Sequence, residues 1–346
     1  MSLDVVVSPY HLTGREAPAV AALLLASRAV TFLPAPLAGA EKDEFQRAVS
    51  ISPRYLKFMD SLRWTMPLWE TGVIASAHEG HDAGREVRHV CDVLVADDRY
   101  ATLRSLTRHD LFEDEKRYLD AVSHDLLRGG PDPGISLPVA GGIDRFGARH
   151  ALAVCRSAAT SIAQRAEDRL AKRLFAIAIP SVLQGDAGRI DVIREELAEP
   201  LDELRAAIGE AIREAYRSEP GEALDREIIA DVEFASRAYS TAFEERRAEF
   251  TADARDDDVR LVLGTITLTL AMLPVDAVLR SGLTAMQTLT GTSSRRAKPA
   301  RGELTGALPN ALEGEVPSPA ALALRDPLAG RSVATLIIKP LGRPHA

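Results

Sequence analysis

The sequence predicts a mainly α protein: a long-helix bundle with a helical layer and a small β element formed by the N-terminal and C-terminal strands. Three observations predict this fold class. Between residues 189 and 250, apolar side chains recur at steps of three or four, which is the repeat of one helical face. A turn at 218–221 divides this stretch into two long helices, which we expect to lie antiparallel. Short β-rich runs near both ends of the chain supply the strands.

The composition is typical of a globular protein with a large apolar core. Hydrophobic residues make up 46% and charged residues 27% of the 346 residues, a length that allows one or two domains. Aromatic residues make up only 5%, so the core must consist mostly of Ala, Leu, Val and Ile. Small side chains of this kind suit closely packed helices.

Turn residues and apolar periodicity divide the chain into six segments. The strongest turn cluster, at 129–134, contains three glycines and two prolines and indicates an internal boundary. The expected segments are a strand–helix–strand unit at 1–40, a layer of medium helices at 41–128, a loop or hinge at 129–143, a long-helix bundle at 144–290 with a buried apolar element at 259–285, a Pro/Gly-rich linker at 291–331 and a C-terminal strand at 332–346.

Two structural questions stay open in the sequence. Residues 259–271 contain alternating Thr and apolar residues, which favour a strand, yet the following residues have helical spacing, so strand and helix are both compatible. The C-terminal strand follows a long linker. It can therefore pair with the N-terminal strands of its own chain or with a neighbouring subunit.

The charge distribution bears on the expected partners. The formal net charge is −8, which disfavours nucleic-acid binding. Residues 295–346 contain eight Lys or Arg and four Asp or Glu, so this tail is +4 and the remainder of the chain is −12. We interpret the tail as solubilising; the alternative is an electrostatic contact with the acidic body or with a partner.

The chain is expected to be cytoplasmic and to lack a transmembrane segment. Cys91 and Cys155 are its two cysteines, too few for a disulfide framework or a zinc pattern. The N-terminus does not have the pattern of a signal peptide. The most apolar run, residues 261–275, is uncharged over 15 residues, whereas a membrane helix needs roughly 20.

Histidines between residues 78 and 150 are the first candidates for chemistry. A cluster of imidazole and carboxylate groups can bind a divalent metal ion if the groups converge on one point. The candidate metal ligands are His78, His81, Asp82 and His89. The competing interpretation is a solvated polar loop, because Gly80 and Gly84 favour a loop in this region.

His-Asp pairs recur at 81–82, 109–110 and 124–125. In helical phosphohydrolases of the HD type, such a pair supplies two metal ligands, and this chemical analogy makes His109, Asp110, His124 and Asp125 candidate catalytic residues. No pair is framed by a complete ligand set, and adjacent residues on a helix point in different directions. Asp110 could equally cap a helix.

A further candidate site follows the first predicted strand. The carboxyl ends of parallel strands usually hold the sites of α/β proteins. Tyr10, His11, Thr13 and Arg15 lie in this position, and His11 is the candidate catalytic residue among them. The alternative is a turn in which Tyr10 and His11 have only structural roles.

Two functional hypotheses follow. Common motifs for nucleophilic serine, phosphate loops, zinc proteases and dinucleotide binding are absent from the sequence. We therefore expect a helical interaction or assembly protein that acts through a protein partner or as a homo-oligomer and needs no cofactor. The alternative is a metal-dependent hydrolase, similar in chemistry to a phosphohydrolase, that binds a divalent metal ion with His and Asp residues between 78 and 125.

Overall fold

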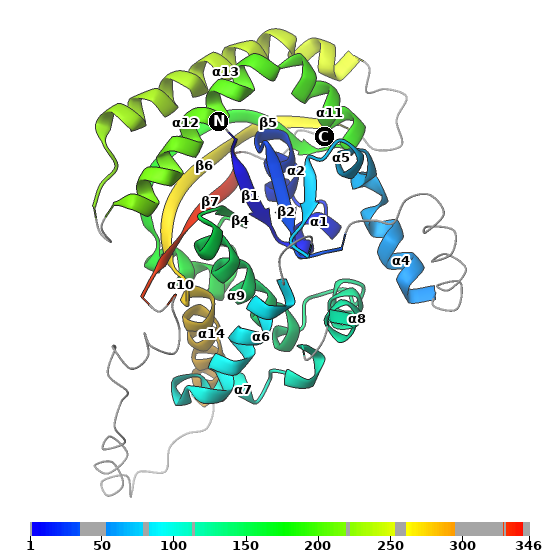
Figure 1. The fold of residues 1–346 in the computed structure, drawn as a ribbon, viewed down its shortest axis with the longest axis vertical. Coiled ribbons are helices and arrows are strands. Elements are labelled where there is room, and N and C mark those ends of the chain that lie inside the picture. Colours follow the sequence, from blue (N-terminus) through cyan, green and yellow to red (C-terminus); the bar gives the residue numbers. More distant parts are fainter. Residues whose placement is uncertain are drawn as a thin grey trace, which may run out of the picture.

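A seven-stranded sheet with helices on both faces forms the centre of the protein (Figure 1). The computed structural model describes residues 2–34, 53–78, 83–112, 115–218, 222–252, 261–294, 328 and 330–341. The strand order is β3-β2-β1-β4-β7-β6-β5. The strands are β1 (Asp4–Val7), β2 (Arg28–Thr31), β3 (Ile74–Ser76), β4 (Ala153–Ser157), β5 (Lys172–Gln184), β6 (Val262–Pro274) and β7 (Ser332–Leu341).

The sheet is mixed. Its first five strands in spatial order, β3 to β7, pair in parallel, whereas β6 runs antiparallel to β7 and β5 runs antiparallel to β6. The strand β7 lies between β4 and β6, so the C-terminal strand pairs within its own chain. The sequence left the run at 259–271 open between strand and helix, and its residues 262–271 belong to the strand β6, whereas residues 259 and 260 lie outside the described residues.

Helices of varied length connect the strands. The described α-helices are α1 (Pro9–Thr13), α2 (Ala17–Leu25), α4 (Pro53–Leu62), α5 (Met66–Glu70), α6 (Ala83–Ala96), α7 (Ala101–Arg104), α8 (Glu115–Leu126), α9 (Pro133–His150), α10 (Ile162–Leu170), α11 (Ala187–Glu196), α12 (Ala198–Arg217), α13 (Arg226–Ala252) and α14 (Ala277–Ser294). Short 3-10 turns occur at Arg63–Thr65, Asp98–Tyr100 and His109–Phe112.

The prediction of a mainly α helical bundle with a small β element is wrong, because the architecture is α/β with a large central sheet. The difference is concentrated in the predicted long-helix bundle at 144–290, where the apolar side chains of residues 154–177 recur mostly at steps of four. This stretch instead forms β4, α10 and the start of β5. A step of four returns to nearly the same side of a helix and, because four is even, to the same face of a strand. The spacing therefore predicts which side chains are buried, but it does not distinguish a helix from a strand.

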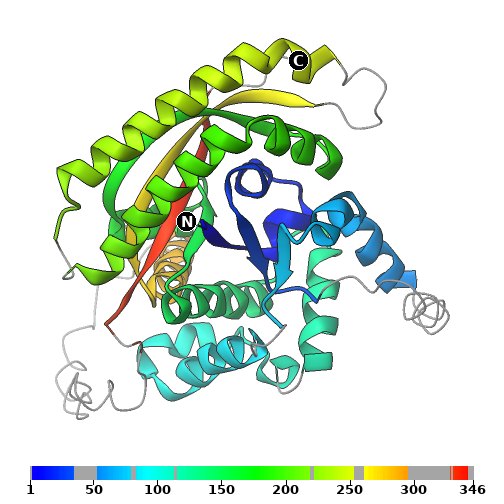
Figure 2. The same cartoon turned by 45° about the horizontal axis from the view of Figure 1, so that its top comes forward.

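One face of the sheet packs against α2, α11, α12 and α13. The strand residues on this face include Ile177, Leu268 and Leu336, which are buried in the same core as Leu204 of α12 and Tyr239 of α13. The helices α12 and α13 lie side by side over the long strands (Figures 1 and 2). Pro200 lies in the first turn of α12, a position where its missing N–H group costs little.

The opposite face packs against α6, α8 and α9. Val154 and Val333 from the sheet share this core with Ile143 of α9. The α6 and α9 backbones approach each other closely, because a Cβ at Gly142 would lie 2.7 Å from Cγ2 and 3.0 Å from the backbone nitrogen of Val87. A glycine is therefore required where these two helices cross.

Candidate functional site

The carboxyl ends of β1, β2 and β3 lie at one edge of the sheet and bring together several of the predicted residues. Tyr10 Oη donates a 2.5 Å hydrogen bond to Oδ2 of Asp125, and the backbone N–H of Asp132 donates to Oδ1 of Asp125 at 2.6 Å. Burial and this hydrogen bond to Asp125 raise the pKa of Tyr10 above its ordinary value. Because both oxygens of the buried Asp125 accept hydrogen bonds from the protein, its carboxylate joins α1 to the start of α9.

His78 lies at the same edge, directly after β3. Its ring centroid is 5.5 Å from that of Tyr118, whose hydroxyl donates to the carbonyl oxygen of Phe32 at 3.0 Å. The backbone N–H of His78 donates to Oγ of Ser76 at 3.0 Å. Tyr10 after β1, His78 after β3 and Asp125 on α8 therefore lie at the same end of the parallel strands.

His11, Thr13 and Arg15 make local contacts around α1. His11 Nδ1 is 2.8 Å from Oε2 of Glu16, and this hydrogen bond lowers the pKa of the Glu16 carboxyl. Thr13 Oγ1 donates to the Pro9 carbonyl oxygen at 2.9 Å, and the Arg15 guanidinium stacks 5.5 Å from the Trp64 ring centroid. These contacts hold the α1–α2 turn and do not join the hydrogen bond between Tyr10 and Asp125.

The other predicted ligands are not brought together in the described part of the chain. His124 is exposed whereas Asp125 is buried, because neighbouring helical residues point in different directions. Asp110 is exposed and lies 3.6 Å from Arg108. His81, Asp82 and the side chain of His109 lie outside the described residues. Among the described residues, which include His78 and His89, no three His, Cys, Asp or Glu side chains are grouped to hold a metal ion. The metal site therefore stays a prediction.

A buried ionic cluster lies under β4 and was not predicted from the sequence. One terminal nitrogen of Arg156 is 2.5 Å from both carboxylate oxygens of Asp144, and the other is 2.6 Å from Glu167. Ser281 Oγ donates to Glu167 at 3.2 Å. The cluster therefore connects β4 to α9, α10 and α14. Its only sequence signal is an arginine within an otherwise apolar strand.

The charges in this cluster are strongly perturbed. Burial, together with the nearby Glu167, raises the pKa of Asp144 to about 6 even though Arg156 acts to lower it. Burial acts to lower the pKa of Arg156, but the two carboxylates outweigh it and raise this pKa above its ordinary value. The cluster has the composition of a structural ion triad, because each carboxylate is bound by the same guanidinium.

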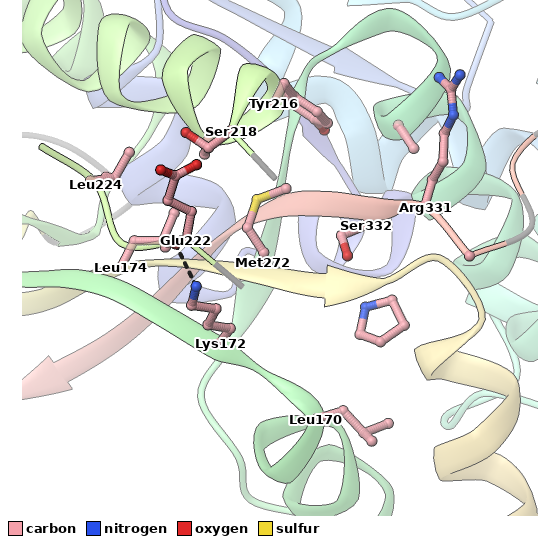
Figure 3. A pocket seen from close by; sticks show the side chains of 14 residues that line it. Leu170, Lys172, Leu174, Tyr216, Ser218, Glu222, Leu224, Met272, Arg331 and Ser332 are labelled. Atoms are coloured by element: carbon pink, nitrogen blue, oxygen red, sulfur yellow. Dashed lines mark hydrogen bonds between the residues drawn. The ribbon is translucent and has the colours of Figure 1, made fainter. Parts of the chain in front are cut away.

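A cavity of about 470 Å³ lies at the opposite edge of the sheet, where β7 begins (Figure 3). Side chains from β5, β6, α12 and the start of β7 surround it. The lining residues are Ala148, Leu170, Lys172, Leu174, Ala215, Tyr216, Ser218, Glu222, Leu224, Met272, Pro274, Gly330, Arg331 and Ser332. None of these residues was a candidate from the sequence, because they come from six separate stretches of the chain and form no motif.

The strand β5 is an edge of the sheet, and its outer side is a candidate interaction surface. Among the described residues, its one strand partner is β6. Ala176 and Ala178 are exposed on the face opposite α13, whereas Phe175, Ile177 and Ile179 are buried. A long edge strand with exposed small side chains can accept a further strand.

Comparisons with known proteins found no matching family model, no similar curated protein and no similar solved structure. Function is therefore argued from the residues of this chain alone.

None of the described helices combines the length and the apolar character needed to span a membrane. The most apolar run of the chain, residues 261–275, contains the strand β6 that lies inside the sheet.

Proposed function

We propose that this chain is a non-catalytic interaction protein that assembles with a second copy of itself through the outer edge of β5. The observation that supports this proposal is the outer edge of β5, a strand of 13 residues that has no second strand partner among the described residues. Mean strands are about half this length. Apart from Pro180, whose carbonyl oxygen accepts a hydrogen bond from Tyr239, an edge of this kind offers backbone donors and acceptors to an incoming strand.

Pro180 shows which residues of β5 direct their backbone N–H and C=O groups away from β6. Proline has no N–H group, and the Tyr239 hydroxyl donates to its carbonyl oxygen at 3.2 Å. In an antiparallel pair, the N–H and C=O groups of one residue point to the same side. Pro180 therefore directs its backbone groups away from β6. Residues two and four positions earlier, Ala178 and Ala176, direct theirs the same way.

The side chains of β5 favour pairing between copies. Residues 174–184 contain no charged side chain, although exposed edge strands are usually protected by charges such as Lys. In an antiparallel pair related by a twofold axis, Ala176 and Ala178 of one copy would lie opposite alanines or other β5 residues of the second copy. Such small side chains make no steric clash. The pairing would join two sheets into one, which is a closed, isologous interface.

The proposal includes a reducing, cytoplasmic environment. Cys91 and Cys155 are both buried and unpaired, and free thiols of this kind persist under reducing conditions. The proposal assigns no catalytic step and no cofactor. Among the described residues, no three His, Cys, Asp or Glu side chains are grouped to hold a metal ion.

The oligomeric state tests the proposal. Light scattering coupled to size exclusion should give a dimer for the natural chain. Ala176→Lys or Ala178→Lys should give a monomer, because each places like charges in the paired edge. Val192→Lys is the matched control, since Val192 is 46% exposed on α11, and it should stay dimeric. A natural chain that is monomeric at every concentration overturns the proposal.

Cross-linking tests the location of the interface. Directly opposed residues in a hydrogen-bonded antiparallel pair have Cα atoms about 5.5 Å apart, which suits a disulfide. Ala176→Cys or Ala178→Cys should therefore give a covalent dimer under mild oxidation, whereas the natural thiols are buried and should not react. Dimers that neither cross-link at these positions nor become monomers with Ala176→Lys or Ala178→Lys would assign the interface elsewhere and overturn the β5 pairing.

A further inference from the structure

The cavity at the start of β7 lies where three helices end. Ala148 is close to the end of α9, Leu170 is the last residue of α10, and Ser218 follows α12 directly. The cavity includes Lys172 and Leu174 from the start of β5, and neither Tyr10 nor Asp125 lines it. Its volume of about 470 Å³ lies within the range of small-molecule sites, about 300–1,000 Å³.

Most of the cavity wall is apolar. Leu170, Leu174, Leu224 and Met272 line it together with Pro274 and two alanines. In Figure 3, Met272 lies at the centre of the view, between the Leu174 and Ser332 sides. A wall of this kind contacts the apolar body of a ligand and excludes water from it.

Two cations line the same cavity. Lys172 is half-buried, and its ammonium donates one hydrogen bond to the Glu222 carbonyl oxygen. An ammonium carries three N–H groups, so further donors remain for a ligand. Arg331 is exposed and lies on the opposite side of the cavity from Lys172, with Met272 and Ser332 between them (Figure 3). No carboxylate of the described residues forms an ion pair with Arg331.

The net potential of the cavity favours an anion. Lys172 and Arg331 contribute two formal positive charges, whereas the exposed Glu222 contributes one negative charge. Helix C-termini carry partial negative charge, which opposes an anion. At the end of α9, however, Tyr216 Oη donates to the carbonyl oxygens of Leu152 at 2.8 Å and Gly147 at 3.3 Å. These carbonyl groups are thus already hydrogen-bonded, and the formal charges dominate.

Tyr216 itself has a fixed structural role. Its hydroxyl also accepts a hydrogen bond from the backbone N–H of Ala334 at 3.0 Å. Burial raises its pKa above the ordinary value, so the phenol stays neutral. Tyr216 therefore shapes the cavity wall and joins α12 to β7, and Lys172 is the half-buried group able to bind a ligand anion.

We propose that this cavity binds a small amphipathic anion. The carboxylate, sulfonate or similar head group contacts the Lys172 ammonium, and the apolar body packs against Leu170, Leu174 and Met272. Arg331, at the exposed side, attracts the anion by long-range electrostatics.

Two fluorescent probes that differ only in charge test this inference. 8-Anilino-1-naphthalenesulfonate has a sulfonate, and N-phenyl-1-naphthylamine has the same apolar body without it. The natural chain should bind the sulfonate probe saturably and at least about tenfold more tightly than the neutral probe, since a hydrogen bond to a charged group is worth about one to two factors of ten. Equal affinity for the two probes, or no saturable binding of the sulfonate probe, overturns the inference.

Three variants locate the binding site. Lys172→Met should remove the preference for the sulfonate probe while neutral-probe binding stays. Ser218→Trp should abolish binding of both probes, because the indole of the introduced tryptophan would fill the cavity. The backbone of Ser218 is extended and accepts any side chain. Arg173→Met is the control, since Arg173 is exposed and does not line the cavity, and it should bind both probes as the natural chain does. Unchanged sulfonate binding in Lys172→Met, with circular dichroism showing intact folding, would contradict the proposed head-group site.

Discussion

One terminal guanidinium nitrogen of Arg156 lies 2.5 Å from both carboxylate oxygens of Asp144, and Asp144 is completely buried. The same guanidinium binds Glu167. Three consecutive elements of the chain, α9, β4 and α10, therefore meet at one charge cluster. Buried charges are costly unless paired, so each member of the cluster depends on the others.

The raised pKa of Asp144 should make the stability of the folded chain depend on pH. Its pKa is raised to about 6 in the folded chain, mainly by burial, from an ordinary value of 3.8. The folded chain therefore binds this proton more tightly than the unfolded chain does. The stabilising effect of protonation is fully present below about pH 4 and is lost as the pH rises through about 6.

The measurement is the free energy of unfolding in urea for the natural chain and for Asp144→Asn, at pH 4 and pH 7. Asparagine cannot titrate, so the difference between the two proteins isolates Asp144. The natural chain should lose about 2 kcal/mol relative to the variant between these pH values. A difference that stays constant, or that changes in the opposite direction, would be incompatible with this assignment.

Removing the shared cation should be more damaging than removing an exposed one. Arg156→Met leaves two carboxylates in a largely buried site without their partner, which typically costs about 3–5 kcal/mol. Arg173→Met removes an ion pair with Asp168 in which the arginine side chain is 63% exposed, so the loss should stay below about 1 kcal/mol. Urea unfolding at pH 7 compares the two variants, and similar losses would show that the cluster is not important for stability.

Gly142 and Gly130 offer a matched test of helix packing. Gly142→Ala places a methyl group against the backbone of Val87, which is completely buried, so we expect a loss of about 1–3 kcal/mol. This loss exceeds the gain of about 1 kcal/mol from the better helix propensity of alanine. Gly130→Ala meets no atom within 4 Å and should be neutral or stabilising by less than about 1 kcal/mol. Thermal unfolding of both variants gives the comparison, and a stabilised Gly142→Ala would refute the close approach.

The two cysteines should be chemically inert in the folded protein. Burial raises the pKa of Cys91, with help from Asp92, and the pKa of Cys155 to about 12. The thiolate is the reactive form, so iodoacetamide at pH 8 should label neither residue until urea unfolds the chain. Mass spectrometry counts the labels. The exposed thiol of Val192→Cys is the positive control, because Val192 is 46% exposed on α11, outside the proposed interface. Rapid labelling of the folded natural chain would contradict the burial of these thiols.

Local patterns in the sequence identify the helices of the α11–α12–α13 region well. Residues such as Ile190, Leu201 and Ile208 form the predicted apolar stripe, and all three are fully buried. The predicted turn at 218–221 falls between the end of α12 at Arg217 and the start of α13 at Arg226, and its residues 219–221 lie outside the described residues. These features are local, because helical spacing and turn chemistry act between near neighbours.

The candidate sites could not be derived in the same way. Lys172, Tyr216 and Arg331 become neighbours around the cavity only because β5, α12 and β7 meet there. The Arg156 cluster likewise needs α9 and α10 to pack against β4. A single sequence shows which side chains are apolar or charged, but it does not show which residues of different helices and strands lie close together.

The sequence by itself determined the first strands at the N-terminus, the stripe that α11 and α12 bury, and the strand character of the C-terminal run that forms β7. Only the tertiary structure decided that β7 enters the sheet between β4 and β6 and that residues 172–184 form an edge strand. The physical reason is that a spacing of four is compatible with helix and strand alike. Pairing with β6 and packing against α13 stabilise residues 172–184 as the strand β5. The fold is therefore an α/β sheet and not the predicted helical bundle.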